Sequence, residues 1–173
     1  DDPAAVYREV ATAPDPIQAA KEVLFLTRNR GAFLKKCPGT REYTCCNYMI
    51  LHIGTFCTMD CSYCILQSYF HPPVLQYFAG FEQMDSVLQK TFSRNRIFRI
   101  GTGEYTDSLI WEKISLMPRF LVDTFAGQDN SVLELKTKTV NIDSLLGLDH
   151  NEKTVIAWSI NTRAVIRSEE RGP

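Results

Sequence analysis

Three cysteines lie in one short segment, Cys57-Thr58-Met59-Asp60-Cys61-Ser62-Tyr63-Cys64, with the spacing C-x3-C-x2-C. Each thiolate of such a segment can bind one iron of a 4Fe–4S cluster. The fourth iron then has no ligand from the segment, so it can bind a substrate or cofactor directly. A cluster with four cysteine ligands, as in electron transfer, cannot do this. The spacing therefore predicts a cluster held by Cys57, Cys61 and Cys64, with one open iron.

A structural zinc site is the alternative interpretation of these thiols. Zinc takes four ligands, and two C-x2-C pairs are the usual pattern for it. Cys45, Cys46 or His52 could complete such a site. The residues alone leave this alternative open.

All six cysteines lie between positions 37 and 64, and none follows. A disulfide framework usually spreads its bridges through a small secreted fold. The first ten residues are acidic and carry no apolar export signal. We therefore expect a reduced, cytoplasmic compartment. For Cys37, Cys45 and Cys46 we expect buried structural thiols, with an auxiliary metal site or a replacement hydrogen donor as alternatives.

The composition is that of an ordinary globular domain: 173 residues, 45% hydrophobic, with a net charge of −1. This balance gives no support for bulk electrostatic binding to nucleic acid or to an anionic membrane. No run of 18 apolar residues exists, so we expect no transmembrane helix and no membrane partner. The chain starts without Met and ends at Glu-Arg-Gly-Pro, so we expect a piece of a longer protein. The basic stretch 27–41 is interpreted as an exposed helix face, with a phosphate-contacting patch as the alternative.

Hydrophobic patterning predicts alternating strands and helices. Pro16 after Asp15 suits the start of a helix over 16–36 that Gly31 breaks or ends. The further expected elements are strands over 48–55, 96–101, 132–140 and 154–160, and helices over 82–92, 108–125 (interrupted at Pro118), 142–147 and 162–170. This order predicts an α/β fold whose parallel strands are joined by crossover helices.

Ligands of parallel α/β sheets bind at the carboxyl ends of the strands. The cysteine segment, Gly101 to Asp107, Lys138, and Ser159 with Asn161 all follow expected strands. Four strands are too few to close a barrel of the usual size, so we expect a partial barrel with an open edge.

The cysteine spacing after a first strand resembles that of the radical S-adenosylmethionine enzymes. In that superfamily the open iron chelates S-adenosylmethionine, and the reduced cluster cleaves it to a 5′-deoxyadenosyl radical that abstracts hydrogen from a substrate. The resemblance implies the first four or so βα units of a (β/α)6 TIM-like barrel. Gly101-Thr102-Gly103-Glu104 resembles the element that holds the methionine amino group.

The chain resembles more closely the spore photoproduct lyase family, in the segments CTMDCSYCILQ, LKTKTVNIDSLLGLDHNEKT and WSINTRAVIRSEERG. The resemblance runs from about Tyr48 to the end. It implies a carbon–carbon lyase of DNA repair that returns a thymine dimer to two thymines. It also implies DNA and an electron donor such as flavodoxin or ferredoxin as partners.

Site residues carried over from this resemblance extend the cofactor site beyond the cysteines. Lys138 would reach the S-adenosylmethionine carboxylate, and Ser159 would bind its ribose. The full set implied for this cofactor is Gly101, Gly103, Glu104, Thr106, Asp107, Lys138, Ser159 and Asn161.

Two departures from the family pattern bear on the substrate. The thymine-dimer enzymes carry a hydrogen-donating Cys just after the second strand, where this chain reads Gly103-Glu104-Tyr105-Thr106-Asp107. They also have Tyr on both sides of the third cluster cysteine, whereas here Tyr63 precedes Cys64 and Ile65 follows it. We therefore name Tyr105 and Tyr63 as candidate catalytic residues. A non-DNA substrate is the second hypothesis, and a zinc-stabilised binding module is the third. The expected organisation is an N-terminal helical extension over 1–47 and a partial barrel domain over 48–173.

Overall fold

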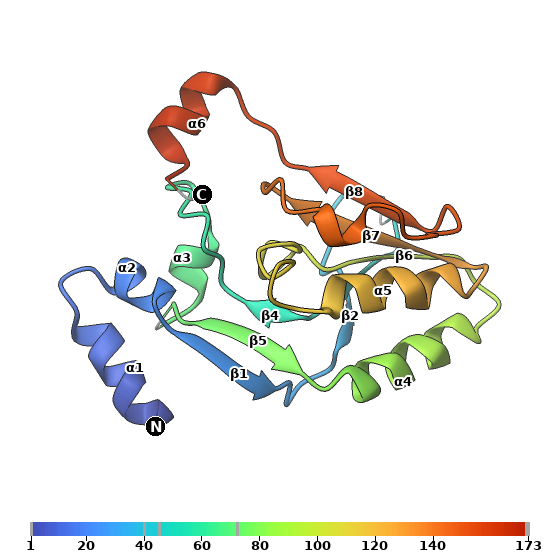
Figure 1. Cartoon of the computed structure of the whole chain (residues 1–173), viewed down its shortest axis with the longest axis horizontal. Helices are drawn as coiled ribbons and strands as arrows, with labels where there is room; N and C mark the ends of the chain where they lie inside the picture. Colours follow the sequence, from blue (N-terminus) through green and yellow to red (C-terminus); the bar gives the residue numbers. More distant parts are fainter. Residues whose placement is uncertain (1, 40, 45, 72, 172–173) are drawn as a thin grey trace. The chain divides into compact units, whose positions relative to one another are not determined.

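The computed structural model describes residues 2–39, 41–44, 46–71 and 73–171 (Figure 1). The chain forms two compact units. The first comprises Asp1–Arg28, Gly54–Ala79 and Ile160–Pro173, and the second comprises Asn29–Ile53 and Gly80–Ser159. In the described part of the chain, no helix is long and apolar enough to cross a membrane. The boundary expected between 47 and 48 stays a prediction.

The first unit is built around a three-stranded sheet in the order β1-β5-β4. The central strand β5 runs parallel to β1 and antiparallel to β4. The elements are α1 (Pro3–Thr12), α2 (Pro16–Lys21), β1 (Leu24–Arg28), β4 (Gly54–Thr55), α3 (Leu66–Tyr69), β5 (Leu75–Ala79) and α6 (Arg163–Glu169).

The helix expected over 16–36 is mostly wrong. It begins as predicted, because the Asp15 carboxylate accepts the backbone N–H groups of Ile17 and Gln18 and Pro16 occupies the first turn. It ends at Lys21, and the following residues form β1 and later β2. A short run of Leu and Phe suits a helix or a strand equally well. Parallel pairing with β5 decides for the strand, and that pairing connects residues about fifty positions apart.

The second unit is built around a five-stranded sheet in the order β2-β3-β6-β7-β8. Strand β2 is antiparallel to β3, and every other neighbouring pair is parallel. This confirms the mixed α/β class and the order of the four expected parallel strands. The elements are β2 (Leu34–Lys36), β3 (Tyr48–Leu51), α4 (Phe81–Phe92), β6 (Phe98–Gly101), α5 (Met117–Ala126), β7 (Ser131–Thr137), the 3₁₀ helix η1 (Asp143–Leu145) and β8 (Thr154–Trp158).

Two expected elements in the middle of the chain are shorter than predicted. The strand expected over 48–55 divides into β3 and β4, which belong to different sheets. The helix expected over 108–125 forms only from Met117 onward as α5. Pro118 therefore does not interrupt the helix but lies in its first turn. There, its missing N–H costs no hydrogen bond.

The core of the second unit lies where α5 packs on β7 and β8. Leu133 and Leu135 of β7 and Phe125 of α5 are fully buried. Helix α4 packs beside α5, with Phe92 edge-on to Phe125 at a centroid distance of 5.1 Å. Side chains alternate along a strand, so the one residue between the two leucines points to the opposite face of the sheet.

That opposite face carries a buried carboxylate, Glu134. Its oxygens accept the Tyr48 hydroxyl at 3.2 Å and the Arg99 Nε–H at 3.0 Å, with the Lys136 Nζ at 3.7 Å. Burial by itself raises the pKa of Glu134, but the hydrogen bonds and positive charge of Arg99, with Lys136 and Tyr48, outweigh it and leave the pKa below its usual value. The ionised carboxylate therefore connects strands β3, β6 and β7.

Replacing Glu134 by Gln should lower the free energy of unfolding at pH 7 by about 1–3 kcal/mol, because Arg99 loses its charged partner. A carboxyl whose pKa is depressed in the folded state stabilises the protein above its unfolded pKa, and loses this effect as the pH falls through its folded pKa. The difference between the variant and the wild type should therefore shrink below about pH 4. Urea unfolding at pH 7 and at pH 3.5 measures it.

Glu82→Gln is the control, because Glu82 is exposed on α4. This variant should change the free energy of unfolding little at either pH. An equal loss for Glu134→Gln at both pH values would contradict the assigned charge state.

Candidate functional site

The cysteine loop, residues 56–65, connects β4 to α3 in the first unit. Phe56 and Asp60 adopt positive φ angles of 66° and 49°, so the backbone turns sharply before Cys57 and again before Cys61. The Cys64 N–H donates to the Cys61 carbonyl at 2.9 Å, which closes a further turn. Cys61 is buried, whereas Cys57 and Cys64 are partly exposed. One short loop thus carries all three predicted ligands.

Backbone groups of the loop contact two of the sulfurs. The Met59 N–H points to the Cys57 Sγ at 3.4 Å, and the Cys61 Sγ lies 3.9 Å from the Met59 carbonyl oxygen. A backbone donor at a sulfur favours the thiolate, which is the form that binds metal.

The spacing of the thiols bears on the kind of group they fit. Among the described residues, no three His, Cys, Asp or Glu side chains are close enough to share one metal ion. A single zinc at about 2.3 Å from each sulfur would need its sulfurs roughly 4 Å apart. A cubane cluster binds each thiolate at a different iron, so its ligands need not meet at one point. The three thiols on this loop fit a cluster in number and chemistry. Cys45, named above as a possible zinc ligand, lies outside the described residues. Cys37 is partly exposed and Cys46 is exposed, so the burial expected for these two thiols is wrong.

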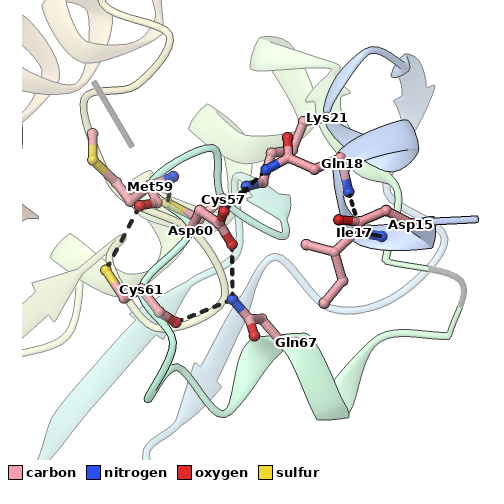
Figure 2. A network of polar contacts seen from close by, with 9 residues as sticks. All are labelled: Asp15, Ile17, Gln18, Lys21, Cys57, Met59, Asp60, Cys61 and Gln67. Atoms are coloured by element: carbon pink, nitrogen blue, oxygen red, sulfur yellow. Dashed lines mark hydrogen bonds and ion pairs between the residues drawn. The ribbon is translucent and has the colours of Figure 1, made fainter. Parts of the chain in front are cut away.

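The Asp60 side chain, between the first two cysteines, contacts three side chains from α2 and α3 (Figure 2). Its Oδ2 lies 2.9 Å from the Lys21 Nζ and accepts the Gln18 side-chain amide at 3.1 Å. Its Oδ1 accepts the Gln67 amide at 3.2 Å, and the same amide donates to the Cys61 carbonyl. Donors from α2 and α3 thus surround a carboxylate whose side chain is 10% exposed.

The other side of the loop contacts the end of α6. The Ser62 N–H donates to the Glu169 carbonyl at 2.8 Å, and Cys61 forms an isolated antiparallel bridge with Glu170. The Tyr63 hydroxyl donates to the Glu170 carboxylate and accepts the Asn161 amide at 2.8 Å. Two predicted site residues, Tyr63 and Asn161, therefore meet in this contact.

The other predicted cofactor residues belong to the second unit, in the segment after β6 and at the ends of β7 and β8. Gly101 and Gly103 are both required by packing. A Cβ at Gly101 would lie 1.7 Å from the Tyr48 hydroxyl, and one at Gly103 would lie 2.6 Å from the Lys136 Cβ. Glu104 is exposed, and Thr106 is buried. Tyr105 packs against the His52 ring at a centroid distance of 4.7 Å.

Asp107 connects the segment after β6 to the end of β7. Its carboxylate accepts the Leu109 N–H at 2.8 Å, the Thr137 hydroxyl at 2.8 Å and the Lys138 N–H at 2.7 Å. Burial raises the pKa of Asp107, and these hydrogen bonds partly offset the rise. Asp107 therefore fixes the backbone from which the Lys138 side chain extends.

Lys138 and Ser159, predicted to bind different parts of the same cofactor, are adjacent in the second unit. The Lys138 Nζ donates to the Ser159 carbonyl at 3.0 Å, and the Ser159 N–H donates to the Thr137 carbonyl at 2.8 Å. A cation and a hydroxyl residue thus follow neighbouring parallel strands.

The side chains that contact Asp60 could not be identified from the sequence alone. Lys21 and Gln18 lie about forty positions upstream, inside a helix whose length was overestimated. The only local signal is Asp60 itself, since an Asp between two closely spaced cysteines suits a left-handed turn.

The spore photoproduct lyase family model matches residues 35–173, and no match was found among curated proteins. A solved structure of spore photoproduct lyase complexed with dinucleoside spore photoproduct has a TM-score of 0.79 at 24% identity, covering 93% of this chain and 46% of that one. A doubly substituted variant with bound AdoMet and dinucleoside spore photoproduct has a TM-score of 0.78 at 24% identity, covering 90% of this chain and 45% of that one.

At this identity, the structural likeness shows a shared fold. The chain spans less than half the length of the solved structures it matches. The family model covers most of the chain, including the cysteine loop and the segments after β6, β7 and β8. The chain therefore belongs to the spore photoproduct lyase family.

Proposed function

We propose that the chain carries the cluster- and cofactor-binding part of a radical S-adenosylmethionine lyase that repairs a thymine dimer in DNA. The observation that carries this proposal is the loop of three cysteines in a chain of the spore photoproduct lyase family. Solved members with AdoMet and dinucleoside spore photoproduct support the choice of cofactor and substrate.

Cys57, Cys61 and Cys64 would hold a 4Fe–4S cluster. When bound, such a cluster supplies the electron that cleaves S-adenosylmethionine at its sulfonium. The loop supports ligation in two ways: the Met59 N–H favours the Cys57 thiolate, and the turn at Cys61 fixes the spacing to Cys64.

The ends of β6, β7 and β8 would bind S-adenosylmethionine. The Lys138 ammonium pairs with the carboxylate of the methionine part, and Glu104 pairs with its amino group. Ser159 binds the ribose through its side-chain hydroxyl. Gly101 and Gly103 let the chain approach neighbouring groups closely, and Asp107 holds the Lys138 backbone, with Thr106 buried beside it. Asn161 completes the proposed set.

Tyr105 and Tyr63 are the candidate hydrogen-atom donors, because no Cys occurs between Gly101 and Asp107. The Tyr63 hydroxyl donates to the Glu170 carboxylate, and the Tyr105 ring packs against His52.

The same missing Cys supports a second candidate function: radical chemistry of this family on a non-DNA substrate. The cluster and the cofactor would be bound by the same residues in both cases. Only the product formed from spore photoproduct separates the two candidates.

Replacing Cys61 by Ala should lower the iron content after anaerobic reconstitution by more than half, because a two-cysteine loop holds a cubane poorly. Iron and sulfide analysis with the visible absorption spectrum measures this. Cys46→Ala is the matched control, since Cys46 is exposed and lies outside the loop, and it should retain the wild-type content. Unchanged iron in Cys61→Ala, or stoichiometric zinc in place of iron, would contradict the proposal.

Replacing Lys138 by Met should weaken S-adenosylmethionine binding roughly tenfold to a hundredfold, as expected for loss of a charged hydrogen bond. Calorimetric titration of the reconstituted protein measures the affinity. Lys153→Met is the matched control, because the Lys153 Nζ also donates to a backbone carbonyl, that of Asp129, and that lysine has no proposed ligand. Equal affinities in wild type and Lys138→Met would remove Lys138 from the site.

With reductant and S-adenosylmethionine, the full enzyme should convert dinucleoside spore photoproduct to its two thymidine units, measured by chromatography together with 5′-deoxyadenosine. Release of 5′-deoxyadenosine without thymidine would favour the second candidate function. Neither product from a protein with a full cluster would contradict both.

A further inference from the structure

We propose that Lys21 is a positioning residue for the cysteine loop, acting through Asp60 together with Gln18 and Gln67. This inference rests on the proposed function, because it concerns the loop that would hold the cluster. It assigns a role in the cluster site to α2, a six-residue helix outside the parallel sheet of the second unit and outside the segment matched by the family model.

The contact is built as a nearly buried ion pair. The side chains of Lys21 and Asp60 are each 10% exposed, and their charged atoms lie 2.9 Å apart. Both Asp60 oxygens are used, since Gln18 donates to Oδ2 and Gln67 donates to Oδ1 (Figure 2). A carboxylate so far removed from water must be matched by donors in this way.

The contact also acts on the backbone at the point where the loop turns. Asp60 has a φ of 49°, a left-handed conformation that Asp adopts more readily than most non-glycine residues and that the contacts of its side chain stabilise here. Gln67 donates to both the Asp60 carboxylate and the Cys61 carbonyl, so one side chain fixes two consecutive residues. The turn that sets Cys57 apart from Cys61 is therefore fixed from α2 and α3.

Helix α2 places Gln18 and Lys21 next to Asp60. Asp15 caps its first turn, and Gln18 and Lys21 are three positions apart, which places them on one face. The Lys21 charge also balances a negative charge between two cluster ligands. Reduction adds an electron to the cluster, so an uncompensated carboxylate there opposes reduction and an uncompensated ammonium favours it.

The first experiment follows alkylation of Cys57, Cys61 and Cys64 in the apoprotein by mass spectrometry. Lys21→Met should raise the rate of at least one of them roughly tenfold, because the loop opens more often once Asp60 loses its charged partner. Lys21→Arg should restore the wild-type rate, and Lys90→Met, an exposed lysine of α4, should leave it unchanged. Wild-type rates in Lys21→Met would overturn the inference.

The second experiment compares cluster reduction potentials by spectroelectrochemistry. Lys21→Met should shift the midpoint to more negative values, and Asp60→Asn should shift it to more positive values. Asp60→Asn also serves if Lys21→Met does not fold, because the amide keeps the shape of the side chain and its oxygen can still accept a hydrogen bond from the Lys21 ammonium. Midpoint shifts of the same sign in the two variants, or no shift in either, would overturn the inference. A pair of side chains that only supports the fold gives no reason for shifts of opposite sign.

Failure of this inference can be distinguished from failure of the proposed function. A wild-type protein that binds no iron contradicts the proposed function, whereas the apoprotein alkylation rates still decide whether Lys21 fixes the loop.

Discussion

A carboxylate removed from water must be matched by donors, and this constraint fixes the segments of the chain that carry its candidate chemistry. Asp60 takes three donors from α2 and α3 and holds the turn of the cysteine loop. Asp107 takes donors from its own segment and from β7, and so fixes the residue that bears the Lys138 side chain. Glu134 joins three neighbouring strands through Tyr48, Arg99 and Lys136. In each case one carboxylate connects segments that are far apart in the sequence and helps to set the path of a loop or the spacing of strands.

This arrangement explains how flexible side chains can form a precise site at the ends of strands. The parallel sheet of the second unit brings the ends of β6, β7 and β8 to one edge, as every parallel sheet does. The buried acid then determines the conformation there: Asp107 orients the backbone, and Lys138 reaches the Ser159 carbonyl. In the first unit the loop itself carries the proposed ligands, and it is supported by α2 and α3 through Asp60 and by α6 through Glu169 and Glu170.

Local patterning predicted much of the second unit, because its strands are short apolar runs between clear helices. The 82–92 helix and the strands near 96–101, 132–140 and 154–160 are confirmed with small changes of boundary. Residues 22–36 were mispredicted, since the strand β1 depends on pairing with β5 far along the chain. The three cysteines could be proposed as cluster ligands from their spacing alone. Lys21 could not be identified from the sequence, because its proposed role depends on its contact with Asp60. The roles assigned to the three cysteines, to the cofactor residues and to Tyr63 and Tyr105 all stay predictions.

The central claim is that three thiolates leave one iron of the cluster open for S-adenosylmethionine. Electron–nuclear double resonance of the reduced protein with S-adenosylmethionine labelled with ¹⁵N and ¹⁷O in its amino and carboxylate groups tests this most directly. Hyperfine coupling from both labels to the cluster is the result expected if that iron binds the methionine group. A reduced cluster that shows no coupling to either label, at saturating S-adenosylmethionine, would contradict the account.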